Sequence, residues 1–311
     1  MTLSNVHYPF AIQLPSPEVT HFSSISVNRN LQIVNHKQGG ATTPCFTGIG
    51  ASNPEISFST RQLKTVLDSV LDSGSGTKNI SRDFSGDNVD LYYQAGKAMD
   101  HREDSATSVH HRARLQSSGM LFWESLSAEQ GQAAEITARI VTAQRAAGDP
   151  LLWTENVTLP SRSGCGRVFT LGPVEYNGTA LDGIEGITLS SNVVPEPISA
   201  DGAKSNVYNG VREFHVQCDV RTSNVGLFSA NAGDTYATLT IYLRRLAETD
   251  QFVADNTAEH IKIILNGGLM TTPEISGMDP ARPRIMFYTK EQVNAGQPVL
   301  PMSLDTASAI T

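Results

Sequence analysis

The sequence predicts a mainly β protein made of two β-sandwich or barrel modules, each with a minor α-helix. Runs of alternating polar and apolar residues recur along the 311-residue chain, whereas helical periodicity is rare. Turn signals, among them the Asn-Gly pairs at Asn177 and Asn266, separate these runs. A weak internal repeat relates the two halves of the chain. Many short strands with few helices are typical of sandwiches and barrels.

The alternating runs predict strands along most of the chain. These are residues 23–27, 31–35, 55–59, 120–123, 134–141, 168–171, 184–190, 213–220, 236–243, 261–265 and 284–288. Over residues 126–138 a helical pattern competes with a strand. Two long hydrophilic stretches, 77–114 and 192–208, are expected to be extended loops, and long loops in compact domains usually have a function.

The clearest local pattern is a strand followed by a helix. After Pro54, residues 55–59 alternate polar with apolar, as in a half-buried strand. The apolar residues that follow lie on one face of a helix: Leu63, Val66, Leu67, Val70 and Leu71. The candidate caps are Ser59, which has capping-box spacing with Gln62, and Thr60. We therefore expect a helix over 60–72 that ends at the Gly/Ser-rich segment 73–76.

The internal repeat has a constant offset in numbering, which is 187 − 25 = 162. At this offset Ile25 aligns with Ile187, Val27 with Leu189, Asn30 with Asn192 and Phe46 with Tyr208. After a gap of about three residues, 53–60 aligns with 212–219, and 125–141 resembles 245–265 more loosely. Because a repeat indicates stacked copies of one unit, we expect a tandem duplication.

The duplication predicts two modules, residues 1–172 and 173–311. The first contains the long loop 77–114, and the second has a C-terminal extension, 275–311. This extension repeats the motif Pro-x-Ile-x-Phe-x-Thr of Pro54 at Pro283. The two-copy scheme leaves that third occurrence without a partner.

Composition excludes several classes of protein. The net charge is −8 and no basic run occurs, which argues against a surface that grips nucleic-acid phosphates. No apolar run approaches the roughly 20 residues needed to span a bilayer, and the N-terminus lacks the pattern of a signal peptide. The three cysteines, Cys45, Cys165 and Cys218, have no CxxC spacing, which suits reduced thiols in a cytoplasm.

No segment has the pattern of a catalytic, cofactor or metal site, so we expect no catalytic residue, no cofactor, no metal and no enzyme. One polar run collects candidate ligands: His101, Glu103, Asp104, His110 and His111. Their spacing fits no tetrahedral zinc site, and a solvated or subunit-contacting loop is the better interpretation. Cys165 lies between glycines and arginines that could lower its pKa, but no histidine partner is identifiable. Trp123 and Trp153 are expected to be core or interface aromatics.

Two segments carry a resemblance to a known family. They are "GASNPEISFSTRQLKTVLDSV", residues 50–70, and "FTLGPVEYNGTALDGIEGITLSS", residues 169–191. In these motifs and in its layout the chain resembles the tail-tube (major tail) proteins of long-tailed phages. That resemblance implies a β-sandwich or barrel core with one flanking helix, and rings that form when the sheets of neighbouring subunits join into a continuous inner barrel. Some members fuse two tube modules and form trimeric rings that imitate hexamers.

The resemblance also implies partners and a location. The chain would bind itself in a trimeric or hexameric ring and in stacked rings, and it would bind other tail proteins. DNA would pass through as cargo, and an acidic lumen would repel its phosphates. The protein would be made in the host cytoplasm, without membrane insertion, and would reside in the virion tail. Residues 77–114 would be the loop that stacks one ring on the next.

Three alternatives remain open at this stage. The first is another virion component, such as a capsid decoration, a head-tail connector or stopper, or a baseplate protein. The second is a carbohydrate-binding receptor-recognition protein, which the two tryptophans and 7% aromatic content support weakly. The third is a hydrolase that uses His110 and His111.

Overall fold

The structure is a computed structural model that describes residues 7–14, 18–70, 81–83, 88–96, 110–116, 119–142, 149–161, 166–198, 208–213, 215–229, 237–248, 252–276, 282–289, 292–294, 297–299 and 302–310. It confirms the mainly β fold. Within these residues, the helical elements are the α-helix α1 (Leu63–Val70) and the short 3-10 helix η2 (Val225–Ser229).

The described residues of the first half form twelve strands. They are β1 (His7–Gln13), β2 (Glu18–Val19), β3 (Phe22–Asn28), β4 (Leu31–His36), β5 (Phe46–Ser52), β6 (Glu55–Thr60), β7 (Ser81–Asp83), β8 (Val89–Ala95), β9 (His111–Leu115), β10 (Gly119–Glu129), β11 (Glu135–Thr142) and β12 (Leu151–Glu155).

Twelve more strands are formed by the described residues of the second half. They are β13 (Phe169–Tyr176), β14 (Thr179–Ala180), β15 (Ile184–Ser190), β16 (Val194–Ile198), β17 (Tyr208–Glu213), β18 (Gln217–Thr222), β19 (Ala237–Arg245), β20 (His260–Ser276), β21 (Arg282–Thr289), β22 (Gln292–Asn294), β23 (Gln297–Val299) and β24 (Met302–Ser308).

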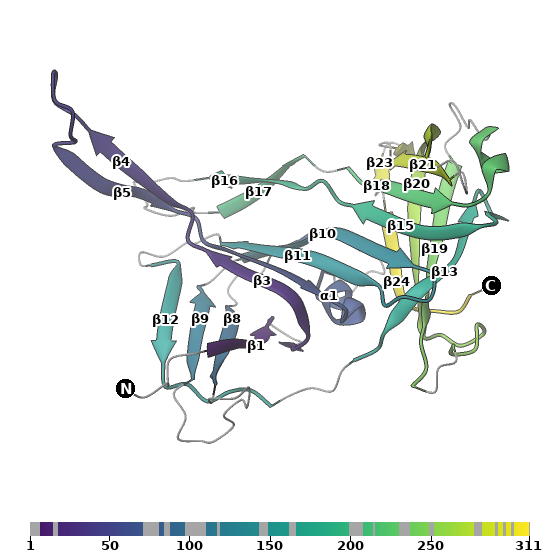
Figure 1. The fold of residues 1–311 in the computed structure, drawn as a ribbon, viewed down its shortest axis with the longest axis horizontal. Coiled ribbons are helices and arrows are strands. Elements are labelled where there is room, and N and C mark those ends of the chain that lie inside the picture. Colours follow the sequence, from purple (N-terminus) through teal and green to yellow (C-terminus); the bar gives the residue numbers. More distant parts are fainter. Residues whose placement is uncertain are drawn as a thin grey trace.

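One 13-stranded sheet runs through both halves of the molecule (Figure 1). Its main path has the order β14-β13-β19-β20-β21-β18-β15-β10-β11-β6-β3, and β24 and β7 pair at its side. A separate five-stranded sheet has the order β12-β9-β8-β1-β2. Two hairpins, β4–β5 and β16–β17, leave the long sheet as arms, which we call arm one and arm two.

The alternation of residues gives the strands of the long sheet one apolar and one polar face. In β6 and β11 every second side chain is buried, including Ile56, Phe58, Ile136 and Ile140. These side chains and Trp123 belong to a single large cluster of buried apolar residues that draws members from both halves. Fully burying an aliphatic or Phe side chain stabilises the fold by about 1.5–3 kcal/mol. The long sheet is therefore held together by one core that crosses the middle of the chain.

The second half repeats the strand pairing of the first. Phe22 pairs with Thr60 between β3 and β6, and Ile184 pairs with Thr222 between β15 and β18, so both members of the pair shift by the offset of 162. Both ladders then have a bulge at the same step, after the first pair. The element order is also the same: a strand, an arm, a second strand and a short helix. The equivalent strands therefore share their register as well as their order.

The correspondence extends to the remaining strands. The hairpin β8–β9 matches β19–β20 pair for pair, as Val89 with Leu115 and Leu239 with Leu265 illustrate. Gly119 pairs with Thr142 between β10 and β11 as Gly268 pairs with Thr289 between β20 and β21. The 17-residue β20 thus corresponds to β9 and β10 together, and we call residues 268–276 its distal part. We refer to β1–β12 as the first module and to β13–β24 as the second module.

The structure corrects the predicted alignment of the repeat. The predicted division between residues 172 and 173 falls inside β13, and the first module as defined above ends with β12 at Glu155. No three-residue gap is needed, because β6 corresponds to β18 at the same offset of 162. The predicted match of 125–141 with 245–265 is wrong. Alternation has a period of only two, so short strands align at many false offsets.

The motif at Pro283 is not a third copy of the unit. It lies in β21, which occupies the place of β11, whereas the motif at Pro54 leads into β6. The predicted extension 275–311 likewise contains β21 and β24, and β24 pairs with β20 as β12 pairs with β9. Both Pro-x-Ile-x-Phe-x-Thr segments look alike because each is a strand whose alternate Ile and Phe side chains are buried.

Two stretches predicted to be loops contain strands. Residues 77–114 include β7, β8 and most of β9, and residues 192–208 include β16. The charges that made the first stretch appear hydrophilic include Asp90 and Arg114, which pair with each other across β8 and β9. A pattern based on single residues cannot detect that neutralisation. Deleting 77–114 would remove core strands rather than a stacking loop.

The helical pattern over 126–138 is also wrong, because β10 and β11 occupy it. Gly131 has a φ of 72° in the turn between these strands, a conformation that favours glycine. The helix predicted over 60–72 is present as α1, but it begins at Leu63, so neither Thr60 nor Ser59 is its N-cap. The Thr60 hydroxyl accepts a hydrogen bond from the Gln62 N–H at 3.1 Å in the turn that precedes the helix. Ser59 instead contacts Thr137.

Candidate assembly surface

The outer edge of β3 forms one end of the long sheet. Among the described strands, β3 pairs only with β6 and ends the long sheet. Ile25 and Val27 on this strand are half-buried, whereas the equivalent Ile187 and Leu189 are buried between two neighbouring strands. An unpaired edge with apolar side chains is a template for pairing with another strand.

Arm one carries an unusual share of exposed apolar side chains. It projects beyond the rest of the molecule at the upper left of Figure 1. Its exposed apolar residues are Leu31 (43%), Ile33 (60%), Phe46 (54%) and Ile49 (58%). Four such side chains on one hairpin indicate a surface that another protein covers.

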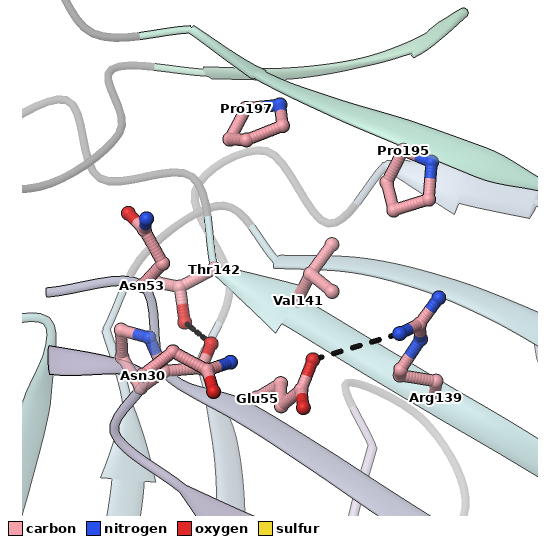
Figure 2. Close-up of a pocket in the computed structure, with 9 residues that line it drawn as sticks. Asn30, Asn53, Glu55, Arg139, Val141, Thr142, Pro195 and Pro197 are labelled. Carbon is pink, nitrogen blue, oxygen red and sulfur yellow. Dashed lines mark hydrogen bonds and ion pairs between the residues drawn. The ribbon is translucent and has the colours of Figure 1, made fainter. Parts of the chain in front are cut away.

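Arm two, in contrast, lies over the first module. Pro195 and Pro197 face Val141 and Arg139 of β11 across a pocket of about 260 Å³ (Figure 2). Asn30, at the base of arm one, lines the same pocket. The contact shows that an arm of this fold can dock on the polar face of a neighbouring module.

Further exposed apolar residues lie at both ends of the molecule. In the second module, Leu269 (44%) and Tyr288 (37%) face each other as a cross-strand pair between β20 and β21. Val225 of η2 is also exposed. In the first module, Leu152 and Trp153 of β12 are exposed.

The polar face of the long sheet carries arginines that are each paired with a carboxylate. Arg139 Nε lies 3.0 Å from Glu124, and Arg284 Nε lies 2.6 Å from Asp219. Arg221 forms an ion pair with Glu129. Between these pairs the same face holds small polar residues, including Ser24, Ser26, Ser57, Ser59 and Thr137. The paired arginines leave little positive charge free on this face for phosphates.

Of the five residues considered as metal ligands, the structure describes His110 and His111. His101, Glu103 and Asp104 lie outside the described residues. His110 is buried, and its Nδ1 accepts the N–H of Ala95 at 3.1 Å. Within the described residues, no group of three or more His, Cys, Asp or Glu side chains could hold a metal ion.

His111 belongs to a small aromatic cluster. Its ring centre lies 4.3 Å from that of His7 and 5.3 Å from that of Trp153. Partial burial, followed by the nearby His7, lowers the pKa of His111, while Glu155 acts in the opposite direction. The described contacts give His111 no nucleophile to activate.

The cysteines differ in their environments. Cys165 lies outside the described residues. Cys45 is exposed just before β5, and Cys218 is fully buried in β18. Burial raises the pKa of the Cys218 thiol, so this residue is not a reactive thiolate.

Sequence reasoning missed one buried ionic cluster. Arg114 donates to both oxygens of Asp90, at 2.6 Å from Nε and 2.7 Å from the terminal nitrogen. Arg112 lies 3.7 Å from the same carboxylate. The hydrogen bond to Asp90 raises the pKa of Arg114, and burial raises the pKa of Tyr92 beside it. Because the charged side chains of this cluster contact groups of opposite charge, the cluster stabilises the five-stranded sheet. It leaves no charged group available to bind a substrate.

Comparisons with known proteins do not identify the chain. Neither the models of known protein families nor the curated proteins contain a match to it. Among the described residues, no helix combines the length and the apolar character needed to cross a membrane.

Proposed function

We propose that this protein is a virion structural protein, the tail-tube subunit of a long-tailed phage. In this role it assembles with itself into rings, and the rings stack into the channel through which DNA passes. The observation that carries the proposal is the combination of an unpaired sheet edge at β3 with a projecting apolar arm one. Both features indicate self-assembly rather than catalysis.

The repeated register supports a tandem duplication. The two ladders β3–β6 and β15–β18 share every pair and the same bulge at an offset of 162. Two equivalent modules in one chain suit a ring in which each chain fills two positions. A trimer of such chains would present six modules.

The chemistry of the polar sheet face also supports a channel. Its arginines are paired with carboxylates, and the chain as a whole has a net charge of −8. A surface without free cations releases few counterions on contact with DNA and therefore binds it weakly. The genome could slide along such a face without adhering to it.

Electron microscopy of the purified protein in negative stain tests this proposal. We expect stacked rings or tubes with a central hole, on the order of 100 Å across for a few domains of this size. A second sample of the protein with excess double-stranded DNA at low salt should show no binding in a mobility-shift assay. Particles that remain monomeric at all concentrations, or spikes and isolated caps instead of tubes, would overturn the tube assignment.

A further inference from the structure

The two modules of one chain contact each other in three places. The first is an edge-to-edge pairing, in which Ser125 of β10 lies opposite Ser190 of β15. The second is arm two, which lies over β11 of the first module. In the third, α1 of the first module contacts β24 of the second, where Thr306 bonds to Lys64 at 3.0 Å and to Asp68 at 2.6 Å.

The equivalent elements at the two outer ends have no such partner among the described residues. In the first module β3 is the equivalent of β15, and its outer edge is unpaired among the described strands. In the second module the distal part of β20 is the equivalent of β10. Among the described strands, the second edge of that distal part is unpaired beyond Gly268, where β19 ends its pairing. Each end of the molecule therefore displays one half of the internal junction.

Apart from Val211 and Phe252, the exposed large apolar residues of the described structure fall on the same two halves. Arm one carries four of them, and the equivalent of its docking face carries Leu269 and Tyr288. The elements equivalent to the third contact also carry exposed apolar residues: Val225 lies on η2, the equivalent of α1, and Trp153 lies on β12, the equivalent of β24. Within the chain the residue equivalent to Trp153 is Leu304 of β24, and it is buried. The exposed apolar side chains thus lie at the two outer ends, on surfaces whose equivalents are in contact in the internal junction.

We propose that a second copy of this chain binds head to tail through a repeat of the internal junction. The β3 edge of one copy pairs antiparallel with the distal part of β20 of the other. Arm one of the first copy then lies over Leu269 and Tyr288. The inference rests on the proposed function in that it takes a second copy as the partner, and it adds which surfaces meet and in which register.

The repeat specifies the register of this pairing. Ser190 corresponds to Asn28 at the offset of 162, and Ser125 corresponds to Glu274, because each lies opposite an equivalent residue of the next strand. Since Ser125 lies opposite Ser190 within the chain, Asn28 of one copy should lie opposite Glu274 of the other. A slip of one residue would turn every side chain to the other face, so the register is specific.

The chemistry of the two faces fits this arrangement. In the internal junction Pro195 lies near Arg139, which is ion-paired to Glu55 at 3.7 Å. At the outer junction Ile33 on arm one takes the place of Pro195. Met286, which takes the place of Arg139, is already buried, so the apolar side chain that β21 presents to arm one is the exposed Tyr288, the equivalent of Val141. An ion-paired surface inside the chain thus corresponds to an exposed apolar surface between copies. Burial of apolar surface supplies the driving force that separate molecules need in order to associate.

Mixing two proteins that each carry one added cysteine tests the register. Both carry Cys45→Ser and Cys165→Ser, while Cys218 is buried and stays; one then carries Asn28→Cys and the other Glu274→Cys. Under mild oxidation we expect a covalent heterodimer when they are mixed and little homodimer when each is alone. The matched control replaces Glu274→Cys by Ser276→Cys, two residues along the strand and beyond the reach of a disulfide. Equal cross-linking in both mixtures, or none in either, would overturn the proposed pairing.

Substitutions on the arm test the docking face without cross-linking. Ile33→Asp or Tyr288→Asp should weaken self-association about tenfold or more, since each places a charge in an apolar contact. Val211→Asp on arm two is the matched control, because Val211 is exposed on the other arm and lies outside the proposed contact. Sedimentation equilibrium measures the association, and an unchanged thermal midpoint shows that each variant folds. An effect of Val211→Asp as large as that of Ile33→Asp would contradict the docking site.

The two proposals fail in different ways. If the correct cysteine pair cross-links but microscopy shows no rings or tubes, the junction stands and the tube function is wrong. If rings form while the cysteine pair does not cross-link and the arm variants assemble normally, the function stands and the junction is wrong.

Discussion

Asn30 and Asn192 are related by the offset of the repeat and adopt the same left-handed backbone, with φ of 44° and 45°. Each follows an equivalent strand, β3 or β15, and precedes an arm. The left-handed region is uncommon for residues other than glycine, although asparagine tolerates it. The chain therefore turns into both arms by the same strained residue.

Replacing either asparagine should separate the effect of the backbone from that of the side chain. Asn30→Ala and Asn192→Ala should each lower the free energy of unfolding by about 1 kcal/mol, because alanine has a higher cost in this region. Asn30→Gly and Asn192→Gly should be milder, since glycine adopts positive φ freely. Urea denaturation midpoints measure the difference, and alanine variants as stable as the glycine variants would contradict it.

Thr60 and Thr222 should be equally important for stability. Each buried hydroxyl accepts the N–H two residues ahead, of Gln62 at 3.1 Å and of Asn224 at 3.0 Å. Each also donates to an equivalent carbonyl, of His21 or of Gly183. Replacement by valine removes both bonds and should cost about 1–3 kcal/mol at either position.

Thr60→Ser and Thr222→Ser serve as the controls, because serine keeps the hydroxyl. They should lose less stability than the valine variants in the same thermal unfolding experiment. A large loss at one threonine and none at the other would mean that the two turns are not equivalent.

The Asp90–Arg114 pair should contribute more than the exposed pairs of the polar face. The Asp90 side chain is only 8% exposed, and Asp90→Asn leaves two arginines without a carboxylate. We expect a loss of about 2–4 kcal/mol in the free energy of unfolding. The matched variant Glu129→Gln breaks the Arg221 pair, whose side chains are 50% and 42% exposed, and should cost less than about 1 kcal/mol. Equal losses in chemical denaturation would refute the ranking.

The stability of the protein should fall as the pH drops through the range in which His111 titrates. Its pKa is lower in the folded protein than in the unfolded chain, so the unfolded chain takes up the proton more readily. The contribution of neutral His111 is therefore complete above its unfolded pKa, about 6.5, and is lost as the pH falls through the lower folded value.

His111→Gln should flatten this pH dependence. The groups that face His111 are His7, His110 and Glu155, so the comparison must keep all three. Thermal midpoints measured between pH 7 and pH 5 should fall less steeply in the variant than in the original protein. The same slope in both would show that His111 does not couple protonation to folding.

The sequence by itself determined the β class, the strand Glu55–Thr60 followed by the helix α1, and the offset of the repeat. These depend on local patterns: alternation with a period of two, apolar spacing on one helical face, and a residue such as Asn30 that returns at Asn192. The tail-tube interpretation also began with the sequence, and it stays a proposal.

Only the tertiary structure decided which strands are equivalent and what the surface displays. Alternation is alike in every strand, so the sequence could not tell that the Pro283 motif lies in β21 and matches β11 instead of β6. Charged residues hid β8 and β9, because Asp90 and Arg114 neutralise each other only after the strands pair. Whether the edge of β3 is unpaired and whether Tyr288 is exposed depends on which segments lie beside them in the folded protein. Those segments are distant in sequence, so only the tertiary structure shows them.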